Sequence, residues 1–85
     1  MEHDLKVWPK FYAALADGTK TFEARVDDRG FAVGDTLLLR EWDAGRGRYT
    51  GPSMRRRVSY LLRGPQFGVE PGYVVMALAA TEERG

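Results

Sequence analysis

The sequence of 85 residues has room for one domain, and its 44% hydrophobic content is enough for a small core. It has no cysteine, which excludes disulfides, thiolate chemistry and the usual ligands of a structural zinc. No apolar run approaches the roughly 20 residues that span a bilayer, and no signal peptide is visible. We therefore expect one cytoplasmic domain over residues 1–85, without membrane contact and treated as a monomer.

The formal net charge is only +1, but the charges are unevenly distributed along the sequence. The segment 40–63 contains seven arginines and two acidic residues, whereas the rest of the chain is acidic on balance. Arginine pairs bidentately with phosphate and stacks on bases, so this segment indicates affinity for a polyanion such as RNA. The arginines that we expect to add contacts to the RNA backbone are Arg46, Arg48, Arg55, Arg56 and Arg57.

The first half of the chain predicts a strand, a helix and a second strand. Residues 1–4 are polar and we expect a frayed tail that contains the single histidine, His3. After a short strand over 5–8, a helix begins at Pro9, where proline is tolerated, and runs to Asp17. Gly18 is a natural C-terminal stop for this helix, and the next strand covers 20–26.

The second half predicts three more strands, over 36–42, 54–63 and 73–80, followed by a polar, disordered tail over 81–85. In the strand 54–63, alternation places Val58, Tyr60 and Leu62 on one face. The element order lacks the alternating βαβα pattern of a doubly wound parallel sheet. It favours a mainly β fold, in which a strongly bent, mostly antiparallel sheet closes into a small barrel with the helix at one opening.

The charged stretch 17–25 is the candidate site. Strand alternation places Glu23 and Arg25 on one face, toward a cleft or water, and Lys20 at the turn can reach the same cleft. This cluster suits a phosphate, a nucleobase or a polar small molecule, and the alternative is a solvated face with an ion pair worth about 0–1 kcal/mol. The apolar residues of the opposite face, which we expect in the core, are Phe22, Ala24 and Val26.

The residues from Gly18 to Arg25 spell G-x-K-x-x-E-x-R, which resembles the signature of the ASCH domain, a member of the PUA-like superfamily. The resemblance extends over nearly the whole chain, and the segment 66–75 is similar to a short ASCH-like subfamily. It implies a five- to six-stranded mixed β-barrel with a helix flanking a cleft that the motif residues line. It also implies binding of RNA or a modified nucleotide, with no cofactor.

The leading expectation is therefore an RNA- or nucleotide-binding module. Lys20 and Arg25 would contact phosphate or base edges, and Glu23 would orient them. Aromatic side chains near the cleft would stack on an unpaired base, at about 1–3 kcal/mol per base. The candidates for this stacking are Trp8, Tyr12 and Trp42.

Other ASCH proteins are enzymes, so whether this chain catalyses a reaction is left open. One branch resembles an amidohydrolase acting on N4-acetylcytidine, from which Lys20 would carry over as the catalytic lysine. The threonine of that branch is Glu23 here, and its distant glutamate has no clear equivalent, which argues against that chemistry. A ribonuclease using Lys20, Glu23 and Arg25 would be the case in which a divalent metal is expected. A third interpretation is a scaffold or toxin–antitoxin-type partner, which would display a large exposed apolar patch.

Overall fold

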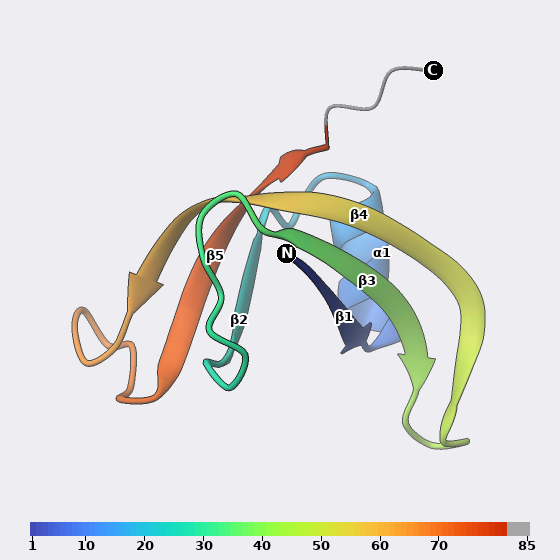
Figure 1. Ribbon diagram of the computed structural model, residues 1–85. Coiled ribbons are helices and arrows are strands. Elements are labelled where there is room, and N and C mark those ends of the chain that lie inside the picture. Colours follow the sequence, from blue (N-terminus) through green and yellow to red (C-terminus); the bar gives the residue numbers. More distant parts are fainter. Residues whose placement is uncertain (82–85) are drawn as a thin grey trace.

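A single curled sheet organises the chain (Figure 1). The computed structural model describes residues 1–81. Its five strands lie in the order β1-β3-β4-β5-β2, with β1 parallel to β3 and the other neighbours antiparallel. This mixed half-barrel, with one short helix among the described residues, confirms the predicted mainly β fold class. The elements are β1 (Glu2–Val7), α1 (Pro9–Ala16), β2 (Phe22–Val26), β3 (Thr36–Asp43), β4 (Arg48–Arg63) and β5 (Tyr73–Ala80).

The N-terminal residues belong to the sheet, so the prediction of a frayed tail over residues 1–4 is wrong. β1 pairs with β3 from Glu2 onward, and its inward residues alternate regularly with exposed ones. His3 is only 5% exposed, because its Nε2 hydrogen-bonds to Asp35 Oδ2 at 2.8 Å and its ring packs edge-on against Phe31. At the other end, Thr81 follows β5 without regular structure, and 82–85 lie outside the described residues.

The helix, a glycine turn and β2 form one continuous unit. Pro9 occupies the first turn of α1, and Trp8 before it is extended, with φ −63° and ψ 149°. The helix ends at Ala16 with Asp17 as its C-cap, after which Gly18 adopts a φ of +86° that favours glycine. The backbone N–H of Lys20 then donates to the carbonyl of Ala14 at 3.0 Å, which turns the chain back toward β2.

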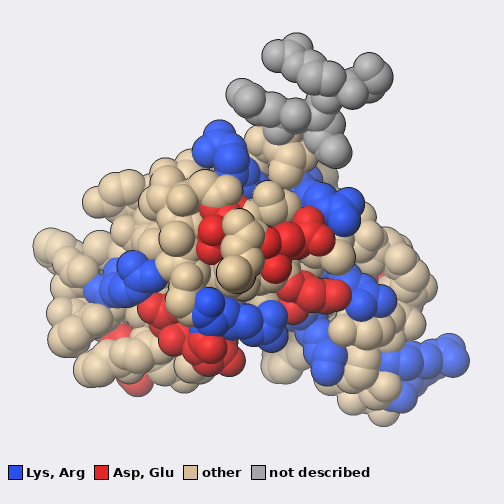
Figure 2. Space-filling model, in the orientation of Figure 1, with Lys and Arg blue, Asp and Glu red and all other residues tan. Residues whose placement is uncertain are grey.

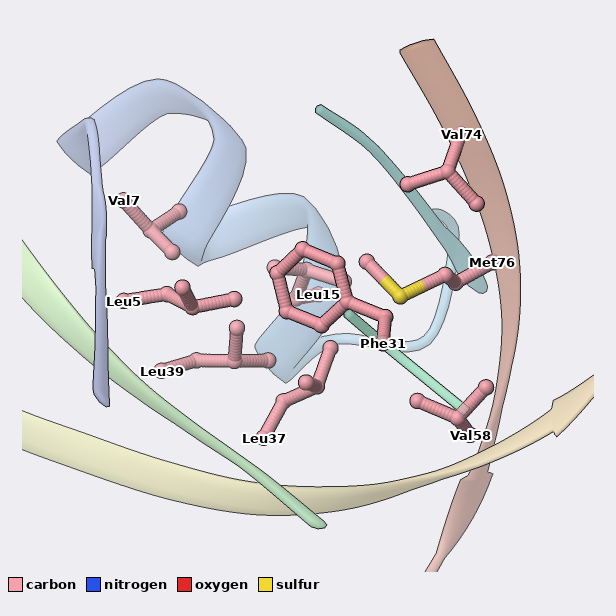
Figure 3. Close-up of a cluster of buried hydrophobic side chains, with 9 residues drawn as sticks. All are labelled: Leu5, Val7, Leu15, Phe31, Leu37, Leu39, Val58, Val74 and Met76. Carbon is pink, nitrogen blue, oxygen red and sulfur yellow. The ribbon is translucent and has the colours of Figure 1, made fainter. Parts of the chain in front are cut away.

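The core lies inside the curl of the sheet, where α1 and the loop before β3 cover it (Figure 3). Phe31 comes from that loop and Leu15 is the one buried residue of α1. The sheet contributes the inward side chains of four strands: Leu5, Val7, Leu37, Leu39, Val58, Val74 and Met76. No helix within residues 1–81 has the length and apolar character needed to cross a membrane.

A register shift in β4 changes which side chains face the core. Between Val58 and Tyr60 the pairing with β5 slips by one residue, as at a β-bulge. Val58 is therefore buried and Leu61 packs against the core, whereas Tyr60 is 66% exposed on the outer face. The expectation that Val58, Tyr60 and Leu62 share one face is wrong for this reason.

Cationic side chains span the space between the two edge strands, β1 and β2. Arg25 Nη2 donates to the carbonyl oxygen of Lys6 at 2.9 Å, and Arg29 Nη1 donates to that of Asp4 at 2.8 Å. Side-chain hydrogen bonds thus link β2 and the loop after it to β1, which are not joined by a ladder of backbone hydrogen bonds. Charged residues on open edges also discourage pairing with another chain.

Candidate functional site

A buried carboxylate holds two cations at the centre of the motif. Lys20 Nζ lies 3.0 Å from Glu23 Oε1, and Arg25 Nε lies 3.5 Å from Glu23 Oε2. Glu23 is 6% exposed overall, while the side chains of Lys20 and Arg25 keep 17% and 25% of their surface. The three side chains form an ion triad with one net positive charge, partly open to solvent.

The triad faces inward, which inverts the predicted burial of β2. Glu23 pairs in register with Met76, a fully buried core residue, whereas Phe22 and Val26 are 46% and 50% exposed. The prediction that Phe22, Ala24 and Val26 enter the core is therefore wrong. β2 is an edge strand at the rim of the half-barrel, so its inner face adjoins an open cleft.

That cleft has a volume of about 490 Å³ and combines cations with flat apolar surface. Trp8, Phe11 and Phe22 are 58%, 39% and 46% exposed around it. The Trp8 and Phe11 rings stack with an interplanar angle of 21° and centroids 6.1 Å apart. The residues that line it are Lys6, Val7, Trp8, Phe11, Lys20, Phe22, Glu23, Ala24 and Arg25.

The Lys20 ammonium lies near two aromatic rings and two oxygen acceptors at the cleft. Its nitrogen lies 4.9 Å from the ring centroid of Phe22 and 5.6 Å from that of Phe11. Two of its three N–H donors are directed to the Phe22 carbonyl, at 2.9 Å, and to Glu23. The third remains for a ligand acceptor such as a phosphate or carbonyl oxygen. Within residues 1–81 no group of three His, Asp or Glu side chains is arranged to hold a metal ion.

The structure brings together four of the predicted site residues and leaves Tyr12 apart from them. Lys20, Glu23, Arg25 and Trp8 all line the cleft. Tyr12 instead packs, partly buried, against the hydrophobic core. Its pKa is raised, chiefly because burial disfavours the charged phenolate.

The hairpin arginines lie away from the cleft. Arg46 Nε is 3.7 Å from Asp43 Oδ2 within the turn between β3 and β4, and Arg48 is exposed at the start of β4. Figure 2 shows basic side chains at this end of the molecule, while acidic side chains gather near the middle of the same face. The hairpin can therefore add charge to a binding surface but does not belong to the motif site.

The three consecutive arginines of β4 are divided between the two faces of the sheet and do not line the cleft either. Arg55 Nε forms an ion pair with Glu2 Oε1 at 2.8 Å, on the outer face. Arg57 is on that same face, in register with Thr36. Arg56 points the other way, toward the turn after α1. The basic segment 40–63 is thus spread over the molecule.

Five residues that line the cleft were not among the predicted site residues: Lys6, Val7, Phe11, Phe22 and Ala24. Lys6 lies between the buried Leu5 and Val7 in the strand. This alternation predicts that its side chain points outward, but it does not predict that the side chain lies beside the cleft. Phe22 lies inside the motif and was assigned to the core because it is apolar. Its exposure follows from the register of β2 with β5, which turns Glu23 inward and Phe22 to the outer face.

The outer face of β2, β5 and β4 carries a contiguous apolar surface. Cross-strand register places its side chains next to one another on the face opposite the core. Phe22, Val26, Tyr60 and Tyr73 are between 44% and 66% exposed. We call this surface the outer apolar face, and it comprises Phe22, Ala24, Val26, Tyr60, Leu62, Tyr73, Val75 and Ala77.

A family model and a phage protein both match this chain. Residues 2–78 match the family model described as "Domain of unknown function (DUF3850)". The chain is also 35% identical, over 57 residues, to a protein of Escherichia phage P2 described as "Uncharacterized 12.9 kDa protein in GpA 3'region". That match covers 67% of this chain, and the chain spans 50% of the length of the phage protein. Because the family model covers most of the chain, this protein belongs to the DUF3850 family.

Proposed function

We propose that this domain binds single-stranded RNA, or a nucleotide unit of it, in the cleft between α1, β1 and β2. The observation that carries the proposal is the meeting of exposed aromatic rings with the Lys20–Glu23–Arg25 triad in one hollow. Rings of Trp8, Phe11 and Phe22 offer surfaces on which any base can stack. The resemblance of the motif to the ASCH signature supports the same conclusion.

The charge arrangement favours an anionic ligand with acceptor atoms. Glu23 compensates one of its two cations, which leaves a net positive site and an available donor on Lys20. Because Glu23 is held by both neighbours, it fixes the positions of Lys20 and Arg25 before a ligand arrives. Preorganised donors of this kind lose little conformational freedom on binding.

The test is a titration of the purified protein with a short single-stranded RNA at two salt concentrations. Binding that engages Lys6, Lys20 and Arg25 should weaken with a log–log salt slope of roughly −2, from about 0.7 per phosphate contact. Lys20→Gln should reduce the affinity by roughly ten- to a hundredfold, as expected for a lost hydrogen bond to a charged group. Val33→Thr, at a loop side chain that is 57% exposed and does not line the cleft, is the control and should leave the affinity nearly unchanged.

The length of the RNA after the titration distinguishes a binding module from an enzyme. Intact RNA with salt-sensitive affinity supports the proposal. Shortened RNA that is not produced by Lys20→Gln would instead make the domain a ribonuclease. Affinity that is equal at both salt concentrations would contradict the role given to the cations.

A further inference from the structure

A second group of aromatic and cationic side chains adjoins the cleft. Trp42 of β3 and Tyr49 of β4 are cross-strand partners whose ring centroids lie 4.9 Å apart at 74°. Lys6 Nζ lies 4.2 Å from the Trp42 ring centroid, and the Arg40 guanidinium carbon lies 3.6 Å from that of Tyr49. Two rings thus meet two cations, each close enough for a cation–π contact.

This group is continuous with the cleft through shared residues. A neighbouring hollow of about 430 Å³ has Tyr49 on one side and shares Lys6 and Arg25 with the cleft. Lys6 and Arg25 line both hollows and are joined by the hydrogen bond from Arg25 Nη2 to the Lys6 carbonyl oxygen. A strand of RNA that occupied both hollows would cross this pair to reach Tyr49 in the second.

The acidic residues of the second hollow are already paired with cations. Asp4 Oδ2 lies 3.2 Å from Arg40 Nη1, and Asp28 Oδ1 lies 3.9 Å from Arg29 Nε. Their charges are therefore compensated locally. The combination of compensated carboxylates, cations and exposed ring surface is compatible with a phosphodiester backbone.

We propose that Trp42, Tyr49, Lys6 and Arg40 form a second base-stacking subsite for the same single strand of RNA. The inference rests on the proposed function and deepens it: the ligand is an oligonucleotide that spans both hollows, rather than a single nucleotide. A base leaving the cleft stacks at the Trp42–Tyr49 pair, while Lys6 contacts the phosphate between the two subsites. Any base can stack on an aromatic ring, so this subsite raises the affinity for longer oligonucleotides without selecting a particular base sequence.

The chain has two tryptophans, and each one reports on a different subsite. Trp8→Phe leaves Trp42 as the single reporter of the second subsite, and Trp42→Phe leaves Trp8 as the reporter of the cleft. Both substitutions keep a ring for stacking. The fluorescence of each variant is followed while it is titrated with uridine monophosphate and, separately, with a short oligouridylate.

The expected result is that the monophosphate quenches Trp8 alone, while the oligouridylate quenches both tryptophans with similar midpoints. Trp42→Ala should weaken oligouridylate binding by roughly five- to a hundredfold and leave monophosphate binding unchanged, because only one stacked base is lost. Val33→Thr, at a loop side chain that is 57% exposed and lines neither hollow, is the control and should change neither affinity.

The outcomes separate the two proposals. If the oligouridylate quenches Trp8 but not Trp42, the second subsite is wrong while the cleft proposal stands. If Trp42→Ala weakens monophosphate and oligouridylate equally, its effect is structural and the subsite is again wrong. If neither tryptophan responds to either ligand, RNA binding itself is contradicted.

Discussion

Glu23 is the residue on which the geometry of the cleft depends. It is almost completely buried, yet both of its carboxylate oxygens have a cation within 3.5 Å. A buried carboxylate without such partners would be strongly unfavourable. The same pairing holds Lys20 and Arg25 in place beside the cleft, so a buried residue positions two cations that are partly open to solvent.

Asp35 has a comparable structural role at the other end of β1. It accepts hydrogen bonds at Oδ2 from the Ala32 N–H at 3.0 Å and pairs there with His3 Nε2 at 2.8 Å. The hydrogen bond with His3 is the main cause that holds the pKa of Asp35 below its usual 3.8; the Ala32 N–H acts in the same direction, and burial opposes both. Because the folded pKa is depressed, the stabilisation is present above about pH 4 and is lost as the pH falls through the folded pKa.

Asp35→Ala should therefore lower the free energy of unfolding by about 1–3 kcal/mol at neutral pH, since it leaves the buried His3 ring and the partly buried Ala32 N–H without their partner. The difference from the unsubstituted protein should shrink when urea unfolding is repeated near pH 3. Asp28→Ala, at a side chain that is 63% exposed, is the control and should change stability by less than about 0.5 kcal/mol. A stability difference that is the same at both pH values would contradict this account.

The sequence predicted the grouping of the motif residues better than it predicted their surroundings. The motif spacing predicted that Glu23 and Arg25 share a face of a strand, and they do. It did not predict which face is inward, because hydrophobicity assigned Phe22 and its apolar neighbours to the core. Likewise His3, in a polar N-terminal segment, gave no sign of its burial, which depends on Asp35, 32 positions away in the chain.

At the level of elements, the unit made by α1, the Gly18 turn and β2 delivers Lys20 to the cleft. An alanine Cβ at Gly18 would meet no atom within 4 Å, so space does not demand glycine there. The backbone conformation favours glycine instead, because an L-residue with a φ of +86° is strained by about 1–2 kcal/mol.

We expect Gly18→Ala to lower the thermal midpoint by roughly 4–8 °C for each 1 kcal/mol lost, and to weaken RNA binding because Lys20 is displaced. Calorimetry and the RNA titration check the two effects. Gly45→Ala in the β3–β4 turn is the matched control, since its Cβ would meet only Asp43 Oδ1 at 3.4 Å and its φ is not positive. Equal midpoints for the two variants would show that the turn tolerates a side chain.

The bounds of the elements also show where predictions from local sequence patterns hold and where they do not. The helix from Pro9 and the strand β5 follow the predicted bounds closely, because proline, glycine and apolar runs are local signals. β4 is longer than expected and carries the shift at Ser59, which moves Tyr60 to the outer face. A β-bulge depends on pairing with the partner strand, so it cannot be predicted from the alternation of residues within β4 alone.

For the whole molecule, the open edges of the sheet are capped by cations, whereas its outer face is apolar and exposed. The edge carbonyls of Asp4, Lys6 and Phe22 accept hydrogen bonds from Arg29, Arg25 and Lys20, so cations that line the two hollows also occupy the open edges. The outer apolar face has no such protection. Exposed apolar surface of this kind marks protein interaction sites, whereas capped edges discourage strand addition.

Self-association, if driven by burial of apolar area, should therefore occur face to face rather than edge to edge. We expect the weight-average mass in sedimentation experiments to rise with protein concentration. Tyr60→Thr combined with Tyr73→Thr should suppress this rise, because it removes two rings that are 66% and 44% exposed while threonine keeps a preference for strands. Val33→Thr, at a residue of the loop before β3 that is 57% exposed, is the control and should leave the rise intact.

A weight-average mass that stays at the monomer value at every concentration would show that this face contacts a different partner or none. A rise that persists in the double variant would place the contact on the edges, against the capping by Arg25 and Arg29.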